Sequence, residues 1–415
     1  MILWMYSGLL FLFGPVVFVV FVWRYGLKRT VRGLRERWGF GGSWPSSGSL
    51  WVHAASVGEV RAAEGFLRAL AVRYPNTPIL VTTTTINGKE LALRLGLASC
   101  VRLAPIDWPG AVRRVLSKVS PRAVVLIETE LWPQWLRVLA SEKVPVVVVN
   151  ARLSDGAFPL YRRLRLFLSP LLASLRAVGA QSDLNARRYR DLGVPSDRIV
   201  VTGNIKNDVP LPDLNRRDDL RKVFRTGPGP VWVAGSTHRG EESVLALVYA
   251  HLRKEFPTLR LVVAPRHVER VSEVFNLFRL HFRVLRRSDL SSSGEWDVLV
   301  LDTVGELTEI YGLADVAFMG GSLVPRGGQN PLEPARWGVP VLWGPSMENF
   351  RDMVSLFESQ GAVRLVSDEA SLTNTLRFLL SSPKERETLG CLVRNLADRQ
   401  RGALDASLHL LRGVF

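Results

Sequence analysis

Short apolar runs rich in β-branched residues recur from residue 50 onward, and segments long enough to form a helix separate them. The runs of the first half are LWVHAA (50–55), PILVTTTT (78–85), AVVLIE (123–128), VPVVVVN (144–150), RAVGAQS (176–182) and RIVVTGN (198–204). Continuous apolar strands are typical of a parallel sheet that helices cover on both faces. The first half is therefore predicted to be an α/β domain.

The alternation stops between residues 207 and 230, where NDVPLPDLNRRDDLRKVFRTGPGP is rich in Pro, Asp and Gly. This composition predicts a linker whose middle could form a short helix. The apolar runs then resume at 231–236, 259–265, 297–302, 315–322 and 339–345. We expect two Rossmann-like, doubly wound domains facing a cleft, at 24–206 and 231–415, joined by the linker 207–230. The last helical stretch, about 383–412, could pack on either domain.

Residues 1–23, MILWMYSGLLFLFGPVVFVVFVW, contain no charged side chain and are long enough to cross a hydrocarbon core of ~30 Å as a helix. They lack the basic start and the small-residue cleavage site of a signal peptide, so we predict a retained membrane anchor. Pro15 leaves a shallow or hairpin-like insertion open. By the positive-inside rule, the basic residues that follow predict that the later domains lie in the cytoplasm: Arg24, Lys28, Arg29, Arg32, Arg35 and Arg37.

The chain carries 54 Lys and Arg against 38 Asp and Glu, a net charge of +16. Such an excess indicates acidic partners. Because it is spread along the chain without the interleaved aromatics of a nucleic-acid platform, an anionic lipid surface and a phosphorylated substrate rank above nucleic acid. Cys100 and Cys391 lie in no C-x-x-C motif, so we predict neither a disulfide nor a metal site for them.

Several motifs of other enzyme classes are absent from the sequence. It contains no P-loop, no G-x-G-x-x-G, no D-x-D, no H-E-x-x-H and no G-x-S-x-G. We therefore predict no nucleotide-bound metal, no zinc hydrolase, no serine-hydrolase triad and no cofactor. The three histidines at strand ends are expected to be hydrogen-bonded polar residues: His53, His238 and His267.

HAASVGEV (53–60) stands where the first apolar run ends and a helical pattern begins. Within it, Ser56 and Glu59 have the S-x-x-E spacing of a capping box. The same spacing also suits a carboxylate at the carboxyl end of a strand, where open parallel sheets bind ligands. Glu59 is therefore either a helix-capping residue or a proton acceptor.

Two further stretches of the first half end strands with charged residues. In IETELWP, Glu128 and Glu130 end a strand two residues apart, and we do not expect them to act as an acid–base couple. One could point to the cleft while the other caps the next helix. In GNIK, Lys206 is either a surface lysine or a cation that stabilises charge on a departing phosphate.

The second half offers three candidate phosphate or nucleotide stretches. STHRGEE (236–242) could bind phosphate at a helix N-terminus or be an ordinary cap with acids in its first turn. In APRH (264–267), Arg266 offers a fork that suits phosphate. In GGSLVPRGGQNPLEP (320–334), glycine pairs let the backbone approach a ligand, and Glu333 could accept hydrogen bonds from ribose hydroxyls.

Together, HAASVGE, TTTTINGKE, IETELWPQ, NARLS, GNIK, STHRGEE, APRH, DTVGEL, GGSLVPRGGQNPLEP and GPSMENF resemble the 3-deoxy-D-manno-octulosonic acid (Kdo) transferases of lipopolysaccharide biosynthesis. The resemblance runs in order from the N-terminal segment to about residue 355. It implies a membrane-associated GT-B glycosyltransferase that moves Kdo from CMP-Kdo to the lipid A precursor (lipid IVA), with inversion and without a catalytic metal.

The resemblance also implies roles for individual residues. Glu59 is the proton acceptor, and Glu128 and Lys206 are the transition-state stabilisers. Family members often have a hydrophobic residue such as Met at Val304 and Phe at Asn207. The implied CMP contacts are Pro265, Arg266, Val304, Gly305, Glu306, Asn330, Pro331, Leu332 and Glu333. The weaker candidates for acceptor binding are Ser56, Gly58, Arg162 and Arg163. A solvated helix face explains the two arginines nearly as well.

Three alternative functions remain for such a chain. One is another membrane-associated GT-B enzyme that uses a UDP-sugar. A second is a non-catalytic membrane-tethered binder, which should lack carboxylates at the cleft, whereas this sequence has Glu59, Glu128, Glu306 and Glu333. A third is nucleic-acid binding, which rests on charge alone and predicts a steep salt dependence.

Overall fold

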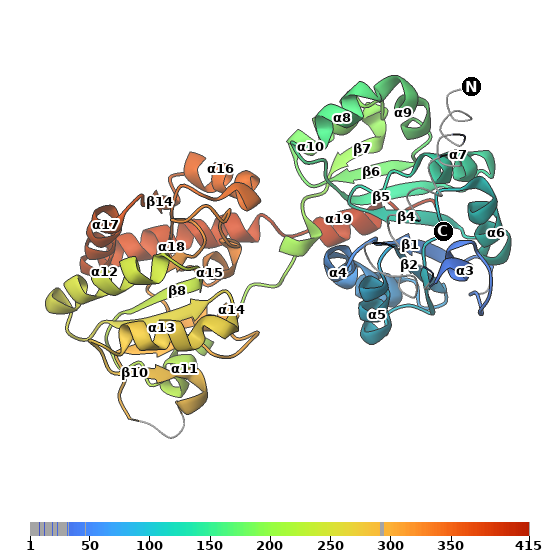
Figure 1. Ribbon diagram of the computed structural model, residues 1–415. Helices are drawn as coiled ribbons and strands as arrows, with labels where there is room; N and C mark the ends of the chain where they lie inside the picture. Colours follow the sequence, from blue (N-terminus) through green and yellow to red (C-terminus); the bar gives the residue numbers. More distant parts are fainter. Residues whose placement is uncertain are drawn as a thin grey trace. The chain divides into compact units, whose positions relative to one another are not determined.

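The computed structural model describes residues 33–45, 47–290 and 294–414, with five single positions before residue 33. The chain divides into two compact units (Figure 1). Unit 1 comprises residues 1–209 and 400–415, and unit 2 comprises residues 210–399.

Unit 1 is built on a seven-stranded sheet in the order β3-β2-β1-β4-β5-β6-β7, and every pair is parallel. The strand order reverses between β1 and β4, which are neighbours with His53 opposite Leu126. Ligands of open parallel sheets bind beyond the carboxyl ends of the strands at such a reversal. The strands are β1 (Leu50–His53), β2 (Ile79–Thr83), β3 (Cys100–Leu103), β4 (Ala123–Ile127), β5 (Val146–Ala151), β6 (Ala177–Ala180) and β7 (Ile199–Val201).

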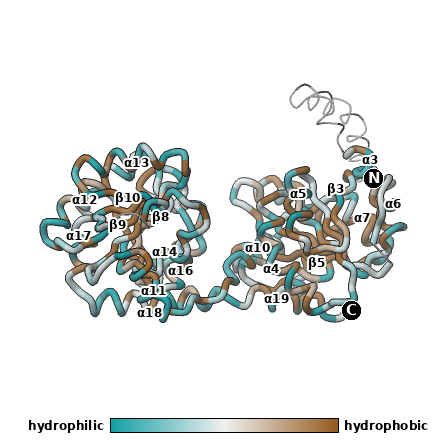
Figure 2. Tube along the Cα trace, turned by 90° about the horizontal axis from the view of Figure 1, so that it is seen from below, coloured by the Kyte–Doolittle hydropathy of each residue, from teal (hydrophilic) through white to brown (hydrophobic). Residues whose placement is uncertain are grey.

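Helices cover both faces of this sheet (Figure 1). Residues of α4, α5 and α19 join the strands in one buried apolar cluster, and residues of α6, α7, α9 and α10 form the other. The apolar residues lie along the strands inside the unit (Figure 2). The helices are α3 (Leu34–Arg37), α4 (Val57–Arg73), α5 (Ile86–Leu95), α6 (Pro109–Val119), α7 (Pro133–Ser141), α8 (Phe158–Arg163), α9 (Arg165–Leu172), α10 (Asp183–Asp191) and α19 (Ala403–His409).

Unit 2 is also built on a seven-stranded sheet, with the order β10-β11-β9-β8-β12-β13-β14 and only parallel pairs. Here the order reverses between β8 and β12. The strands are β8 (Val231–Thr237), β9 (Arg260–Pro265), β10 (Val284–Arg286), β11 (Val298–Val300), β12 (Val316–Met319), β13 (Val341–Trp343) and β14 (Val363–Leu365).

Two apolar clusters again lie on the two faces of the sheet. Residues of α12, α13 and α17 build one, and residues of α11, α14, α15 and α16 build the other, while α18 contributes to both. The prediction of two parallel α/β domains is thus confirmed. The helices are α11 (Arg216–Val223), α12 (Glu241–Glu255), α13 (Val271–Phe278), α14 (Leu307–Ile310), α15 (Leu332–Arg336), α16 (Arg351–Ser359), α17 (Glu369–Ser381) and α18 (Pro383–Asp398).

The limits of the units differ from the predicted domains in two places. Residues 400–415 belong to unit 1, so the predicted domain 231–415 is wrong at its end. The reason is packing, because Leu408 and Leu411 are buried in the apolar cluster that includes α4. The short helix predicted within the linker 207–230 is α11, but Leu220 of that helix is buried in a core cluster of unit 2, so most of the predicted linker belongs to that unit.

The predicted membrane anchor, residues 1–23, lies outside the described residues apart from positions 8, 12, 19 and 23. Within the part of the chain that the structure describes, no helix is both long enough and apolar enough to cross a bilayer.

Candidate functional site

The Glu59 carboxylate lies at the N-terminus of α4, just beyond β1. Ser56 is the N-cap residue, and its Oγ accepts a hydrogen bond from the Glu59 amide at 3.4 Å. Glu59 Oε2 in turn accepts from the Ala55 amide at 2.7 Å, and Oε1 accepts from the Ser56 hydroxyl at 3.1 Å. Ser56 and Glu59 therefore form a reciprocal cap, but the Glu59 carboxylate bonds to the amide of Ala55, the residue before the N-cap, and not to the amide of Ser56 itself. Gly58 is exposed in the first turn, beside Ser56 Oγ.

The surroundings of Glu59 raise its pKa to about 7. Burial is the main cause, and the negative charges of Glu130 and Glu128 add to it, while the hydrogen bonds from Ala55 and Ser56 oppose it. A carboxylate with a pKa near neutrality is partly ionised at pH 7 and can still accept a proton strongly. Capping and base chemistry are thus compatible for this residue.

Glu128 lies directly after β4 in a left-handed conformation, with φ of 64°. A non-glycine residue in this region costs of order 1–3 kcal/mol and persists only where its surroundings hold it there. The Glu128 amide donates to Val149 O at 3.0 Å, and the Tyr189 hydroxyl donates to Glu128 O at 3.2 Å. The strained backbone aims the Glu128 side chain at Lys206, whose Nζ lies 2.8 Å from Glu128 Oε1.

Asn150, at the end of β5, connects these groups and was not singled out from the sequence. It is buried, and its φ of 60° is also left-handed. Its Oδ1 accepts from the Ile205 amide at 3.1 Å, and its Nδ2 donates to Glu128 Oε1 at 3.5 Å. Asn150 therefore fixes the backbone just before Lys206 as well as the carboxylate that Lys206 contacts. An Asn inside an apolar run is the sequence signal that could have revealed it.

Glu130 points to a different set of partners from Glu128. Its Oε2 accepts from Trp132 Nε1 at 2.8 Å and lies 3.6 Å from Nε2 of the fully buried His53. His53 Nδ1 lies 3.0 Å from Thr82 Oγ1. Burial opposes ionisation of Glu130, but the contacts with His53 and Trp132 outweigh it and lower the pKa of Glu130. In the first turn of the next helix, α7, the Trp135 amide donates to Asp107 Oδ1 at 3.0 Å, and the N-cap residue Trp132 makes no side-chain capping bond.

The basic residues considered for acceptor binding lie on α8. Arg162 and Arg163 are exposed, and the Arg162 guanidinium lies 5.9 Å from the centre of the Phe158 ring. Large apolar side chains on the same segment are exposed as well, among them Leu160 and Leu166. The surface of α8 and the start of α9 is thus both basic and apolar.

In unit 2, the predicted CMP-binding residues lie beyond the carboxyl ends of β9 and β11 and at the start of α15. The Arg266 amide donates to Thr237 O at 3.0 Å. Burial raises the pKa of Glu333, while the charges of Arg336 and Arg266 and a 3.5 Å bond from Thr308 lower it. The structure therefore brings Arg266 and Glu333 near each other.

The loop after β11 carries the remaining predicted contacts. The Val304 side chain is 83% exposed, and Gly305 has a φ of 96°, which favours glycine. Glu306 Oε1 lies 3.0 Å from Arg287 Nη2. At the start of α15, Asn330 Oδ1 accepts from the Leu332 amide at 3.1 Å. Val304 can therefore contact a ligand without any rearrangement of the core.

In the stretch 236–242, the carboxylate of Glu241 takes the position next to the His238 amide that a phosphate could have taken. The buried Glu241 accepts hydrogen bonds from the amides of His238 and Gly321 at 2.8 and 2.7 Å, and from those of Ser322 and Leu323 at 3.0 Å. The acid in the first turn of α12 thus ties the end of β8 to the loop after β12.

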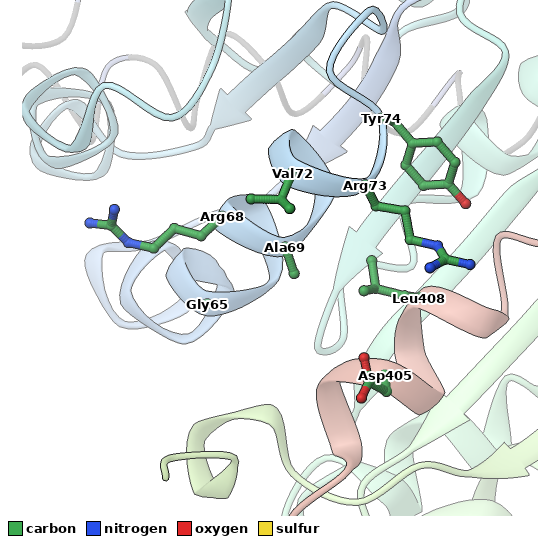
Figure 3. A pocket seen from close by; sticks show the side chains of 8 residues that line it. All are labelled: Gly65, Arg68, Ala69, Val72, Arg73, Tyr74, Asp405 and Leu408. Atoms are coloured by element: carbon green, nitrogen blue, oxygen red, sulfur yellow. The ribbon is translucent and has the colours of Figure 1, made fainter.

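An open groove of about 830 Å³ lies between α4 and α19 (Figure 3). Its lining starts at Gly65, and at 1.5 Å per residue this is about 9 Å along the helix from Glu59. The groove therefore belongs to the opposite end of α4. Within the described ranges, no three His, Cys, Asp or Glu side chains gather where they could hold a metal ion.

The chain is similar to known proteins over nearly its whole length. A family model described as 3-deoxy-D-manno-octulosonic-acid transferase (kdotransferase) matches residues 32–209. The 3-deoxy-D-manno-octulosonic acid transferase of Haemophilus influenzae is 35% identical over 98% of this chain and 97% of its own. The chain belongs to the Kdo transferase family. It is therefore a glycosyltransferase of lipopolysaccharide biosynthesis.

Other relatives agree with this assignment. The 3-deoxy-D-manno-octulosonic acid transferase of Bordetella pertussis is 34% identical and covers 88% of this chain and 87% of its own. Among solved structures, the UDP-GlcNAc 2-epimerase of Neisseria meningitidis, bound to UDP-GlcNAc, has a TM-score of 0.59 over 88% of this chain and 99% of its own, at 16% identity. That similarity concerns the fold alone, two α/β domains of the GT-B type.

Proposed function

We propose that this Kdo transferase moves Kdo from CMP-Kdo to a primary sugar hydroxyl of the lipid A precursor, with inversion at the anomeric carbon. Family membership and the arrangement around Glu59 support this proposal. The acceptor oxygen forms a bond to the anomeric carbon, the bond from that carbon to the phosphate oxygen breaks, and CMP departs with the electron pair. The hydroxyl proton goes to Glu59.

The observation that carries the proposal is the raised pKa of Glu59, about 7, at the carboxyl end of β1. A base with this pKa matches a neutral operating pH. When an acceptor hydroxyl approaches, the carboxylate needs one free lone pair. Each Glu59 oxygen accepts one hydrogen bond in the free protein, so a second lone pair of each remains available.

Glu128 and Lys206 are proposed to stabilise the transition state. An oxocarbenium-like centre gains positive charge that a carboxylate offsets, and the leaving phosphate gains negative charge that an ammonium offsets. The 2.8 Å pair keeps both groups in place before the donor arrives. Since the Lys206 side chain is 44% exposed, it can exchange part of its contact with Glu128 for the phosphate.

Unit 2 is proposed to bind the CMP moiety of the donor. Arg266 supplies a guanidinium fork for phosphate, and Glu333 accepts hydrogen bonds from the ribose hydroxyls. Their mutual proximity and the positive φ of Gly305 in the neighbouring loop support this assignment.

The acceptor is a lipid, so we propose that the enzyme works at the cytoplasmic face of the inner membrane. The apolar residues 1–23 and the basic residues that follow them are the expected membrane contacts. Arg162 and Arg163 are proposed to hold the acceptor's phosphates, and the exposed Leu160 and Leu166 beside them suit acyl chains.

The test is the substitution Glu59→Gln in the full chain, with Kdo transfer from CMP-Kdo to the lipid acceptor measured in detergent by mass spectrometry. We expect the rate to fall at least about 100-fold, the usual range for loss of a general base. Glu64→Gln is the matched control, because Glu64 lies on the same helix and pairs only with Arg68 among the described residues. A Glu59→Gln rate within a few-fold of wild type would remove the base assignment.

A thermal-shift titration separates this proposal from an enzyme that uses a UDP-sugar. We expect CMP to raise the melting temperature and UDP to leave it nearly unchanged at the same concentration. The opposite order would favour the UDP-sugar alternative.

A further inference from the structure

Four basic side chains gather where the strand order of unit 2 reverses. His238 follows β8, Arg266 and His267 follow the neighbouring strand β9, and Arg326 lies in the loop after β12. The imidazole rings of His238 and His267 meet edge to face, with their centres 5.8 Å apart. We call these four residues the basic cluster.

Gly321 brings the β12 loop against this cluster. It has a φ of +70°, and a Cβ at this position would lie 3.1 Å from His238 Cδ2 and 3.3 Å from Arg326 Cβ. The imidazole of His238 and the start of the Arg326 side chain therefore both lie close to Gly321. Three segments that are distant in sequence thus contribute to one small region.

The positive charge of the basic cluster is only partly offset, because Glu333 acts on Arg266 and Glu242 acts on His238 from beyond ion-pair distance. Among the described residues, no carboxylate lies within ion-pair distance of His238, Arg266, His267 or Arg326. Burial and then the charges of His267, Arg326 and Arg266 lower the pKa of His238, while Glu242 alone opposes them. Glu242 is itself occupied, since its Oε1 lies 2.7 Å from Arg270 Nη1 and accepts from Thr237 Oγ1 at 2.9 Å.

Four backbone amides of this region are already bonded to Glu241. Glu241 accepts from the amides of His238, Gly321, Ser322 and Leu323, so it occupies the position that an anion would take in an open nest of amides. A ligand that neutralises the basic cluster cannot use these four amides, so side chains supply its charged contacts. The charges of Arg266 and Arg326 disfavour a third positive charge on His238, and a bound anion offsets this repulsion.

We propose that His238, Arg266, His267 and Arg326 form an oxyanion-binding site of unit 2. Its ligand is a phosphate or a carboxylate group. If the proposed function holds, this group is the phosphate or the sugar carboxylate of the donor; only this identification of the ligand rests on the proposed function. His238 and Arg326, which flank Gly321, determine the affinity for the anion, and His267 positions the His238 ring.

Inorganic phosphate is the first probe, added to the full chain in detergent while the ring resonances of labelled histidines are followed by NMR. Phosphate should raise the pKa of His238 by about one unit, because a bound anion favours the imidazolium, and this corresponds to about tenfold tighter binding to the protonated form. Phosphate should accordingly bind more weakly as the pH rises through the His238 titration.

The variants His238→Gln and Arg326→Gln should each weaken phosphate binding about tenfold or more, the range for loss of one charge-assisted hydrogen bond. Arg326→Lys, which keeps the charge, should retain most of the affinity. Arg239→Gln is the matched control, because Arg239 neighbours His238 in sequence but its Nη2 lies 2.8 Å from Glu273. Equal losses in the control and in the two test variants would overturn the proposal.

Titrations with CMP, cytidine and free Kdo identify the source of the oxyanion. A loss for CMP with cytidine unchanged assigns the site to the phosphate, and a loss for Kdo alone assigns it to the carboxylate. Wild-type affinity of both variants for phosphate, CMP and Kdo overturns the site. If the two variants lost phosphate binding but the wild-type enzyme transferred no Kdo, the proposed function would be rejected and the oxyanion site would still stand.

Discussion

Lys206 Nζ lies 2.8 Å from Glu128 Oε1, although 78 residues separate the two in sequence. Glu128 follows β4, and Lys206 lies in the short 3₁₀ turn Ile205–Asn207 that follows β7. Between them, β5 places Asn150 so that its side chain bonds to both segments. The pair is therefore held by the sheet, and a cation and an anion are positioned before any ligand binds.

Replacing Lys206 by Met should lower the rate of Kdo transfer about 100-fold or more, because one donor to a developing oxyanion is worth this much in other enzymes. The apparent affinity for CMP should change little if Lys206 acts on the transition state. Steady-state kinetics with both substrates measures the two effects separately.

Lys222→Gln controls for the loss of a positive charge in the substitution of Lys206. Lys222 is exposed on α11, and its Nζ lies 3.8 Å from Asp219. We expect wild-type kinetics for this variant. A Lys206→Met enzyme that differed only in its affinity for CMP would contradict the role in the transition state.

The raised pKa of Glu59 predicts the pH dependence of catalysis. A general base works in its ionised form, so kcat/KM should rise with pH up to about 7 and level off above it. The acid limb should disappear from the residual activity of Glu59→Gln. An acid limb centred near the ordinary carboxyl pKa of 4.5 would contradict the effect of burial on this residue.

The same pKa predicts how stability depends on pH. The folded protein holds the Glu59 proton up to about pH 7, whereas the unfolded chain releases it near 4.5. Between these values the folded state binds more protons, so the contribution of Glu59 to the free energy of unfolding should fall as the pH rises. Urea unfolding at pH 5 and pH 7 should show a smaller loss for Glu59→Gln than for wild type.

Asn150→Ala should destabilise unit 1. It leaves the buried Ile205 amide without its acceptor, at a cost of about 1–3 kcal/mol, and it keeps a Cβ at a left-handed position. Asn150→Gly makes the same bond impossible but adopts this φ without strain, so it should be more stable than the Ala variant by about 1 kcal/mol. Hydrogen exchange in the full chain measures the protection of the Ile205 amide in both variants.

Transfer activity should fall in both Asn150 variants, since the Glu128 carboxylate loses a donor and the turn before Lys206 loses its attachment. Equal protection of the Ile205 amide in wild type and Asn150→Ala would show that the Asn150 side chain does not hold this turn.

The periodicity of the sequence correctly predicted the central strands of both sheets but missed three strands. These are β3, β10 and β14, and each lies at the edge of its sheet. Their residues are short runs that include arginine, such as Arg286 in β10, and they are only partly buried. An edge strand has one neighbour and needs no continuous apolar run, so its sequence resembles a loop.

The candidate site shows a similar division. The motifs at strand ends identified Glu59, Glu128 and Lys206, because parallel strands deliver their following residues to one edge. Local spacing could not reveal that Asn150 joins two of them, that Glu241 fills its own nest of amides, or that Arg326 lies close to His238.

The sequence by itself determined the parallel α/β architecture, the order of the motifs and the family, because hydrophobic periodicity and motif spacing are local properties of the chain. Only the tertiary structure decided which charges meet, how far burial moves the pKa of Glu59, and that residues 400–415 return to unit 1. These depend on distances and desolvation between segments far apart in the chain, which no local pattern encodes.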